Sequence, residues 1–302
     1  MTDPAAPIKP ASSNAPLLPS AALVLGGALW GVMWVPIRAL EQAGLDGAWP
    51  TIAMFSAALT LLLPLILLRA RRLAGLWLPL MISGLLAGAA FSFYGISLAL
   101  TEVVRAVLLF YLTPIWGTAL GLIFLGERLT PLRIIALLGG VGGLVAILGG
   151  DGLPLPRNAG DWLALTSGFA WAFGSLAIYR LRTPAINDQI IAFVAGSIVV
   201  ALGAVLIAGD TLGSAPAGAR TLAALPLAFL AGAYIVPVIW LTIWPASLLS
   251  PGRVGLLLMS DVVVGVATAA AFAGELFGWR EAFGTILIVG ASAVAVLERQ
   301  GH

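Results

Sequence analysis

Long apolar segments, separated by short stretches that carry the charges, are the feature that most limits how this chain can fold. The segment 76–98, for instance, runs for 23 residues without a charged side chain. A helix of about 20 apolar residues crosses the ~30 Å hydrocarbon core of a bilayer with its backbone polar groups bonded internally. Membrane-barrel strands would instead alternate apolar and polar residues. The sequence therefore predicts an all-α membrane protein in contact with a lipid bilayer.

Composition supports this class and excludes several others. Charged residues make up 9% of the chain, against about 25% in soluble domains. The 15 basic residues are scattered between the apolar segments, so no cluster predicts nucleic-acid binding. No cysteine is present, which removes disulfides and thiolate chemistry, and the one histidine is the last residue, His302. We expect no metal and no cofactor.

Breaks at charges, prolines and glycines divide the chain into ten predicted spans, after a flexible cytoplasmic tail at 1–19. Their bounds are 20–37, 49–68, 76–98, 103–125, 131–149, 160–179, 189–208, 222–244, 252–274 and 280–297. Placing both termini in the cytoplasm puts ten Lys and Arg residues inside and five outside. This distribution follows the positive-inside rule and predicts a multi-pass protein with both ends in the cytoplasm.

An internal repeat relates the two halves of the chain. Shifting 105–142 by 148 positions, without gaps, gives ten identities in 38 positions, among them Arg105 with Arg253 and Glu127 with Glu275. The repeat predicts two units, spans 1–5 (20–149) and spans 6–10 (150–298). Because five is odd, the second unit enters the membrane from the opposite side, which is an arrangement common in secondary transporters.

Four stretches of the chain resemble one known superfamily: RAVLLFYLTPIWGTALGLIFLGERLT and LLGGVGGLVAIL most specifically, and SPGRVGLLLMSDVVVG and AGELFG more weakly. They resemble the drug/metabolite transporter superfamily, specifically its ten-span EamA-type members, and the resemblance covers about 20–298. Within the superfamily the chain looks most like the YddG-type exporters of aromatic and other mostly neutral amino acids, which implies a bacterial inner membrane. The resemblance implies ten helices around a central cavity, with spans 5 and 10 at the back of each half. At 54–56 this chain reads MFS, where many EamA members carry an arginine.

Asp261 differs from the other charged residues because it lies about nine residues into a span. A carboxylate at the centre of a membrane helix costs about 2.5–3.5 kcal/mol, so it should face a cavity or a partner. It is expected to attract a substrate ammonium group or to carry a proton. A purely structural, hydrogen-bonded acid is the alternative.

Aromatic residues inside the spans are the other candidates for substrate contact. Aromatic walls offer apolar area, faces for cations and a few polar donors, which suits a zwitterion with an apolar side chain. For any one ring, helix packing or lipid contact is the alternative. The predicted substrate-binding residues are Trp30, Trp34, Phe91, Tyr94, Tyr111, Trp171, Ser175 and Asp261.

A Gly-Glu pair ends the fourth span of each unit, at Glu127 in the first unit and Glu275 in the second. Each is predicted to be a helix-end acid held by a neighbouring base or loop amide, with Arg128 and Arg133 near Glu127 and Arg280 near Glu275. The alternative is a gate pair that breaks when the cavity changes sides. Exposed ion pairs contribute only about 0–1 kcal/mol, so a gate would need partial burial.

Together these features predict a secondary transporter that exports neutral amino acids by alternating access, and not an enzyme. A membrane serine protease would need a histidine inside the bilayer, and an aspartyl protease a second membrane aspartate. A broad exporter of hydrophobic drugs or small metabolites is the alternative function. The expected partners are a small zwitterion, with a proton as a further candidate, and lipid. A monomer is expected, and a dimer stays open.

Overall fold

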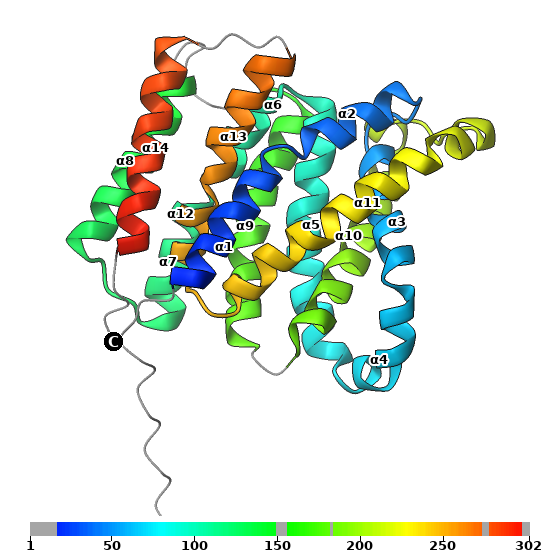
Figure 1. The fold of residues 1–302 in the computed structure, drawn as a ribbon, viewed down its shortest axis with the longest axis horizontal. Helices are drawn as coiled ribbons and strands as arrows, with labels where there is room; N and C mark the ends of the chain where they lie inside the picture. Colours follow the sequence, from blue (N-terminus) through cyan, green and yellow to red (C-terminus); the bar gives the residue numbers. More distant parts are fainter. Residues whose placement is uncertain (1–16, 149–155, 182–183, 274–277, 298–302) are drawn as a thin grey trace, which may run out of the picture.

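The computed structural model describes residues 17–148, 156–181, 184–273 and 278–297, which contain helices and no strand (Figure 1). The helices are α1 (Leu17–Trp30), α2 (Trp34–Gln42), α3 (Trp49–Leu61), α4 (Leu63–Gly75), α5 (Trp77–Leu100), α6 (Val103–Phe110), α7 (Thr113–Leu125), α8 (Pro131–Leu148), α9 (Ala159–Arg180), α10 (Ile186–Ala208), η1 (Gly209–Leu212), α11 (Gly218–Ala246), α12 (Pro251–Leu258), α13 (Ser260–Thr268), η2 (Ala269–Ala273) and α14 (Trp279–Leu297). The all-α prediction is confirmed.

Six helical stretches in the described residues are long and apolar enough to cross a membrane, and a seventh follows if α3 and α4 count as one bent span. Shorter apolar helices lie at Thr113–Leu125, Pro131–Gly143 and Ala282–Ala291. All ten predicted spans fall on helices. Length and apolarity alone identify only six or seven of them as membrane-crossing, so the count of ten stays a prediction.

Several spans expected as continuous helices are broken. Three of the breaks are followed by a proline in the first turn of the new helix, at Pro36 in α2, Pro64 in α4 and Pro114 in α7. Proline lacks the N–H that an interior helical position would use, but it fits the first turn, where that N–H has no intrahelical partner. The fourth break, at Met259 between α12 and α13, has no proline.

The breaks in the fourth and ninth predicted spans correspond under the 148-residue shift. Helix α6 ends at Phe110 and α12 ends at Leu258, which is 148 positions later. The closing motif also has a physical basis in the first copy: Gly126 ends α7 with a left-handed φ of 66°, a conformation that favours glycine. Glu275 lies outside the described residues, so the second closing motif cannot be compared.

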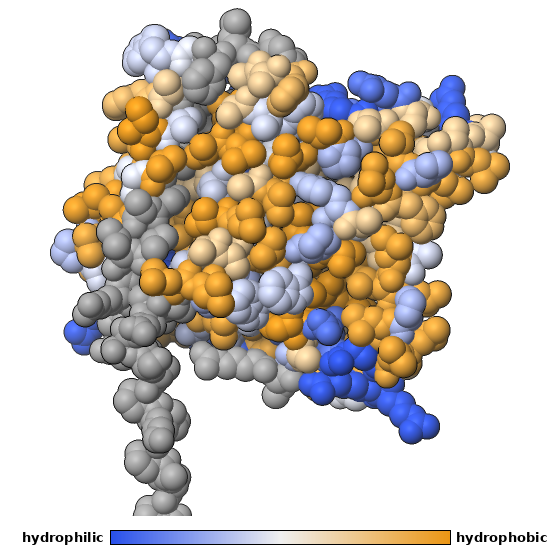
Figure 2. Space-filling model, viewed as in Figure 1, coloured by the Kyte–Doolittle hydropathy of each residue, from blue (hydrophilic) through white to orange (hydrophobic). Residues whose placement is uncertain are grey.

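The helices pack as a bundle in which helices from the first half of the chain contact helices from the second half (Figure 1). Helix α5 packs against α9 and α10, while α11 packs against α1 and α3. Helices α8 and α14, which correspond to predicted spans 5 and 10, pack against each other at one edge of the bundle. Figure 2 shows hydrophobic residues across the middle of the visible face and hydrophilic ones toward its upper and lower edges, as a lipid-embedded bundle requires.

Candidate functional site

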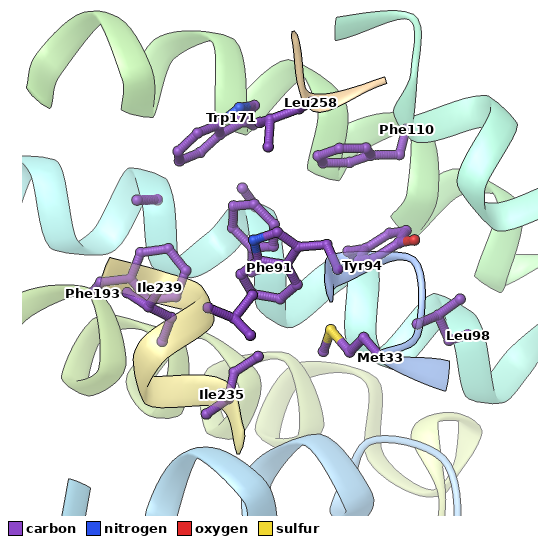
Figure 3. Packing of buried hydrophobic residues seen from close by; sticks show 14 of the residues in the cluster. Met33, Phe91, Tyr94, Leu98, Phe110, Trp171, Phe193, Ile235, Ile239 and Leu258 are labelled. Atoms are coloured by element: carbon purple, nitrogen blue, oxygen red, sulfur yellow. The ribbon is translucent and has the colours of Figure 1, made fainter. Parts of the chain in front are cut away.

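Aromatic rings from α1, α5, α6, α9 and α10 meet in one buried cluster (Figure 3). Phe91 is its middle member: its ring stacks on Trp30 with centroids 4.0 Å apart and meets the edge of Trp171 at 5.0 Å. Phe193 of α10 and Phe110 of α6 lie 5.4 and 5.8 Å from the Phe91 ring. These five rings, here called the ring cluster, are each at most 1% exposed.

Two tyrosines connect the ring cluster to Asp261. The rings of Tyr94 and Tyr111 lie 4.9 and 5.0 Å from Phe110. Tyr111 Oη is 2.8 Å from Asp261 Oδ2 and 2.6 Å from the Leu258 carbonyl, so one hydroxyl proton has two acceptors. Tyr94 Oη donates to the same carboxylate oxygen at 3.4 Å. Tyr111 reaches both acceptors because it lies in the break between α6 and α7.

Asp261 is 1% exposed and is the second residue of α13, directly after the break at Met259. Its Oδ1 has no hydrogen-bond partner among the described residues, and no described base forms an ion pair with it. A buried carboxylate is costly unless it is paired. The two tyrosines satisfy one oxygen, and the other remains available to a cationic or donor group.

Six of the eight predicted binding residues belong to the ring cluster or to the Tyr94–Tyr111–Asp261 hydrogen bonds, and the other two make different contacts. Trp34 opens α2 and donates through Nε1 to Thr268 Oγ1 at 3.1 Å. Ser175 donates to the Ala172 carbonyl of its own helix at 3.0 Å. A serine hydroxyl commonly makes this bond inside a helix, and a 3.6-residue period does not distinguish it from a cavity-facing serine.

Phe110, Phe193 and Thr242 belong to this region but were not predicted from the sequence. Thr242 accepts a hydrogen bond from Trp30 Nε1 at 2.8 Å, whereas Trp171 Nε1 has no partner among the described residues. A signal for Phe110 was available, since it precedes Tyr111 in the apolar stretch that carries the family resemblance. Nothing in the sequence joins Thr242 to Trp30, which lies 212 residues away.

At one end of the bundle, Glu127 pairs with Arg133, one of the two bases expected near it, and not with Arg128. The Arg133 Nη1 to Glu127 Oε2 distance is 2.7 Å, and Arg133 Nη2 also reaches Ser250 Oγ at 3.4 Å. The Arg133 side chain is 7% exposed, so the pair has the partial burial that a gate would need. Arg128, the residue after Glu127, is exposed. Arg133 lies in the first turn of α8, which brings it back to Glu127.

An ion pair that the sequence did not predict lies at the other end, where Arg105 Nε contacts Asp161 Oδ2 at 2.6 Å. Asp161 also accepts from Thr101 Oγ1 at 2.9 Å and from the Arg157 backbone N–H at 2.8 Å. Its own N–H is capped by the Asn158 side chain. Asn158 followed by an acid three residues later is a helix-start signature that could have identified this site.

No group of three or more His, Cys, Asp or Glu in the described part of the chain could hold a metal ion. The arrangement instead offers closely packed, buried aromatic rings and one buried carboxylate oxygen without a partner among the described residues.

Residues 18–149 match the model of the EamA-like transporter family. Together with the six or seven apolar helical stretches, this match identifies the chain as a multi-pass membrane protein. No curated protein matches. A solved structure described only as "Crystal structure of protein" is similar over 93% of this chain and 98% of its own, with 21% identity and a TM-score of 0.65. At that identity the likeness shows a shared fold alone.

Proposed function

We propose that this protein is a secondary transporter of a bacterial inner membrane, with both termini in the cytoplasm, that exports amino acids with aromatic or other neutral side chains. It works by alternating access of two inverted five-span halves, 20–149 and 150–298. The EamA-like match of the first half supports transport of a small molecule. The choice of amino acids rests on the central site.

The helix contacts support the inverted repeat, because they fall into exchanged pairs. Helix α1 packs against α11, α12 and α13, and α9 packs against α5, α6 and α7, which are the corresponding helices of the other half. Likewise α11 packs on α3 while α5 packs on α10. A two-fold exchange of the halves produces this pattern.

Close backbone contacts support the same relation between the halves. A Cβ added at Gly27 of α1 would lie 2.9 Å from the Leu258 carbonyl, and one added at Gly168 of α9 would lie 2.3 Å from the Phe110 carbonyl. Leu258 and Phe110 are 148 positions apart, while Gly27 and Gly168 are 141 apart. The 141-residue shift also relates Trp30 to Trp171, the two indoles on either side of Phe91.

The unpartnered Oδ1 of Asp261, buried beside the ring cluster, is the single observation that carries the substrate assignment. A substrate ammonium group would supply the missing charge, and the neighbouring rings would contact an apolar side chain. Sugar phosphates fit poorly, because the residues around Asp261 provide a negative charge and no ion-paired base.

The two ion pairs at opposite ends are the parts that would change during transport. Arg105–Asp161 joins α6 to α9, and Arg133 joins Glu127 to Ser250 before α12, so each links one half to the other. With the rings fully buried and both links formed, the centre is closed to both sides. Alternating access would open one link at a time.

Uptake by proteoliposomes of a labelled panel of neutral, acidic and basic amino acids tests this function. We expect uptake of phenylalanine and leucine, competition among neutral amino acids, and no competition by a sugar phosphate. Competition by a quaternary-ammonium drug alone, without amino-acid uptake, would favour the broad exporter of hydrophobic drugs. Empty liposomes and the Asp261→Asn variant are the controls.

A further inference from the structure

Helix α4 is unlike the rest of the bundle, because it bends by 76° from α3 and none of its 13 residues is buried. It contacts α3, α5 and α10 at the lower right corner in Figure 1. An amphipathic helix with exposed leucines and arginines at the end of a bundle fits a position along the membrane surface. Its exposed face then meets lipid.

The exposed face of α4 changes character along the helix axis. Leu63, Leu67 and Leu68 in the first half are 49, 69 and 85% exposed. Arg71 and Arg72 in the second half are also exposed, and Trp77, which follows at the start of α5, is 62% exposed. Tryptophan prefers the headgroup level. The leucines thus lie at the level of the hydrocarbon and the arginines at the level of the headgroups. This order matches the acyl chain and the headgroup of one phospholipid molecule.

The charges at this corner are not balanced by the protein. Asp188, buried at the start of α10, accepts from Arg69 and from Arg72 Nε at 2.8 Å. These two arginines fix α4 on α10, and one carboxylate cannot neutralise both. Arg71 is two residues from Arg69, which places it on the opposite side of the helix. It forms no ion pair with any residue that the structure describes.

The hydrophilic patch at this corner is visible in Figure 2 beside hydrophobic residues. We propose that α4 is a binding site for an anionic phospholipid, whose phosphate contacts Arg71 and Arg72 while an acyl chain covers Leu63, Leu67 and Leu68. The pair of arginines on Asp188 holds the helix at the depth where both contacts are possible. Long arginine side chains reach the headgroup level from such positions. This site is separate from the proposed transport site.

Equilibrium binding of a fluorescent phosphatidylglycerol to the detergent-purified full chain tests the proposal. Unlabelled phosphatidylglycerol should displace the probe, and phosphatidylcholine of the same chain length should not. Arg71→Gln should weaken binding about fivefold, since one basic residue near an anionic surface contributes about that factor. Leu68→Asn should weaken it as well, because the acyl contact is lost.

Arg128→Gln is the matched control, because Arg128 is equally exposed, lies on the same predicted side of the membrane and forms no ion pair among the described residues. Its affinity for the probe should not change. Thermal unfolding of all variants should agree within error, which excludes misfolding as the cause. Equal loss in Arg71→Gln and Arg128→Gln, displacement by phosphatidylcholine, or displacement by soluble glycerol phosphate would each overturn the proposal.

Discussion

The first half of the chain, from α1 to α8, and the second half, from α9 to α14, place the same residue types around the centre. Trp30 and Trp171 both contact Phe91, one stacked and one edge-on, and Gly27 and Gly168 lie against the carbonyl of the residue that ends α12 and α6, respectively. These shared positions are rings and glycines, which determine how closely helices approach.

The polar residues differ between the halves. Tyr94, Tyr111 and Asp261 form one cluster, and the positions related to them by 148 residues are Thr242, Met259 and Thr113. Thr113 donates to the Phe110 carbonyl at its own helix break, and Thr242 accepts from Trp30. The end contacts differ too, because Arg105 binds the carboxylate of Asp161 whereas Arg253 reaches the hydroxyl of Ser20 at 3.3 Å.

At these positions the packing residues occur in both halves, while the Tyr94–Tyr111–Asp261 cluster occurs once. If the halves form the proposed two-fold scaffold, a second buried acid at its centre would repel the first. The following predictions test whether corresponding positions behave alike where packing dominates and differently where polar groups dominate.

Asp161→Ala should have the largest effect on stability, about 2–3 kcal/mol. It removes the acceptor for Arg105, Thr101 and the Arg157 N–H, although partial exposure of Arg105 keeps the loss below that of a fully buried pair. Ser20→Ala, at the corresponding place, should cost about 1 kcal/mol. Thermal unfolding in detergent compares the two. Equal destabilisation would contradict the asymmetry.

Asp261→Asn should lower kcat/KM for neutral amino acids about tenfold or more, because a hydrogen bond to a charged partner contributes about 1.5–3 kcal/mol. The asparagine can still accept from Tyr111, so folding should be retained. Asp210→Asn, at an exposed position, is the control and should transport normally. Unchanged amino-acid transport in the Asp261 variant would remove this residue from the site.

Gly27→Ala and Gly168→Ala should each destabilise the protein by about 1–3 kcal/mol, because an added methyl group would meet backbone or side-chain atoms at 2.3 Å. Gly203→Ala in α10 is the control, since no atom lies within 4 Å of its added Cβ. That substitution should be neutral or slightly stabilising. Unfolding midpoints of the three variants measure the effect. A tolerated alanine at only one of the two contact positions would break the correspondence.

Trp30→Phe should cost about 1 kcal/mol more than Trp171→Phe. Both lose ring area, but among the described residues Trp30 Nε1 has a partner, Thr242, which would lose its donor, and Trp171 Nε1 has none. Unfolding free energies of the two variants, with Thr242→Val as a third arm, give the difference. If Trp171→Phe were the more damaging variant, its indole N–H would have a role that the structure does not show.

Much of the architecture could be predicted from the sequence, because lipid allows so few backbone solutions. The apolar segments locate the helices, and the position of Asp261 marks the centre. The broken helices were harder: prolines 36, 64 and 114 were visible, but proline inside a helix also occurs without a break, as Pro226 and Pro237 do in α11. Ser175 and Trp34 show the limit of helical periodicity. It predicts which residues share a helix face, but not which residues that face contacts.

The partners of the charged residues required the fold. Arg128 and Arg133 were both candidate partners of Glu127, and the turn into α8 brings Arg133 to it. Asp188 binds arginines more than a hundred residues earlier, and Tyr111 reaches Asp261 across 150 residues. Apolarity and helical periodicity are properties of residues that are neighbours in the chain, so they define the helical class and the position of each segment. Which side chains meet depends on how distant helices pack, and no local pattern contains that information.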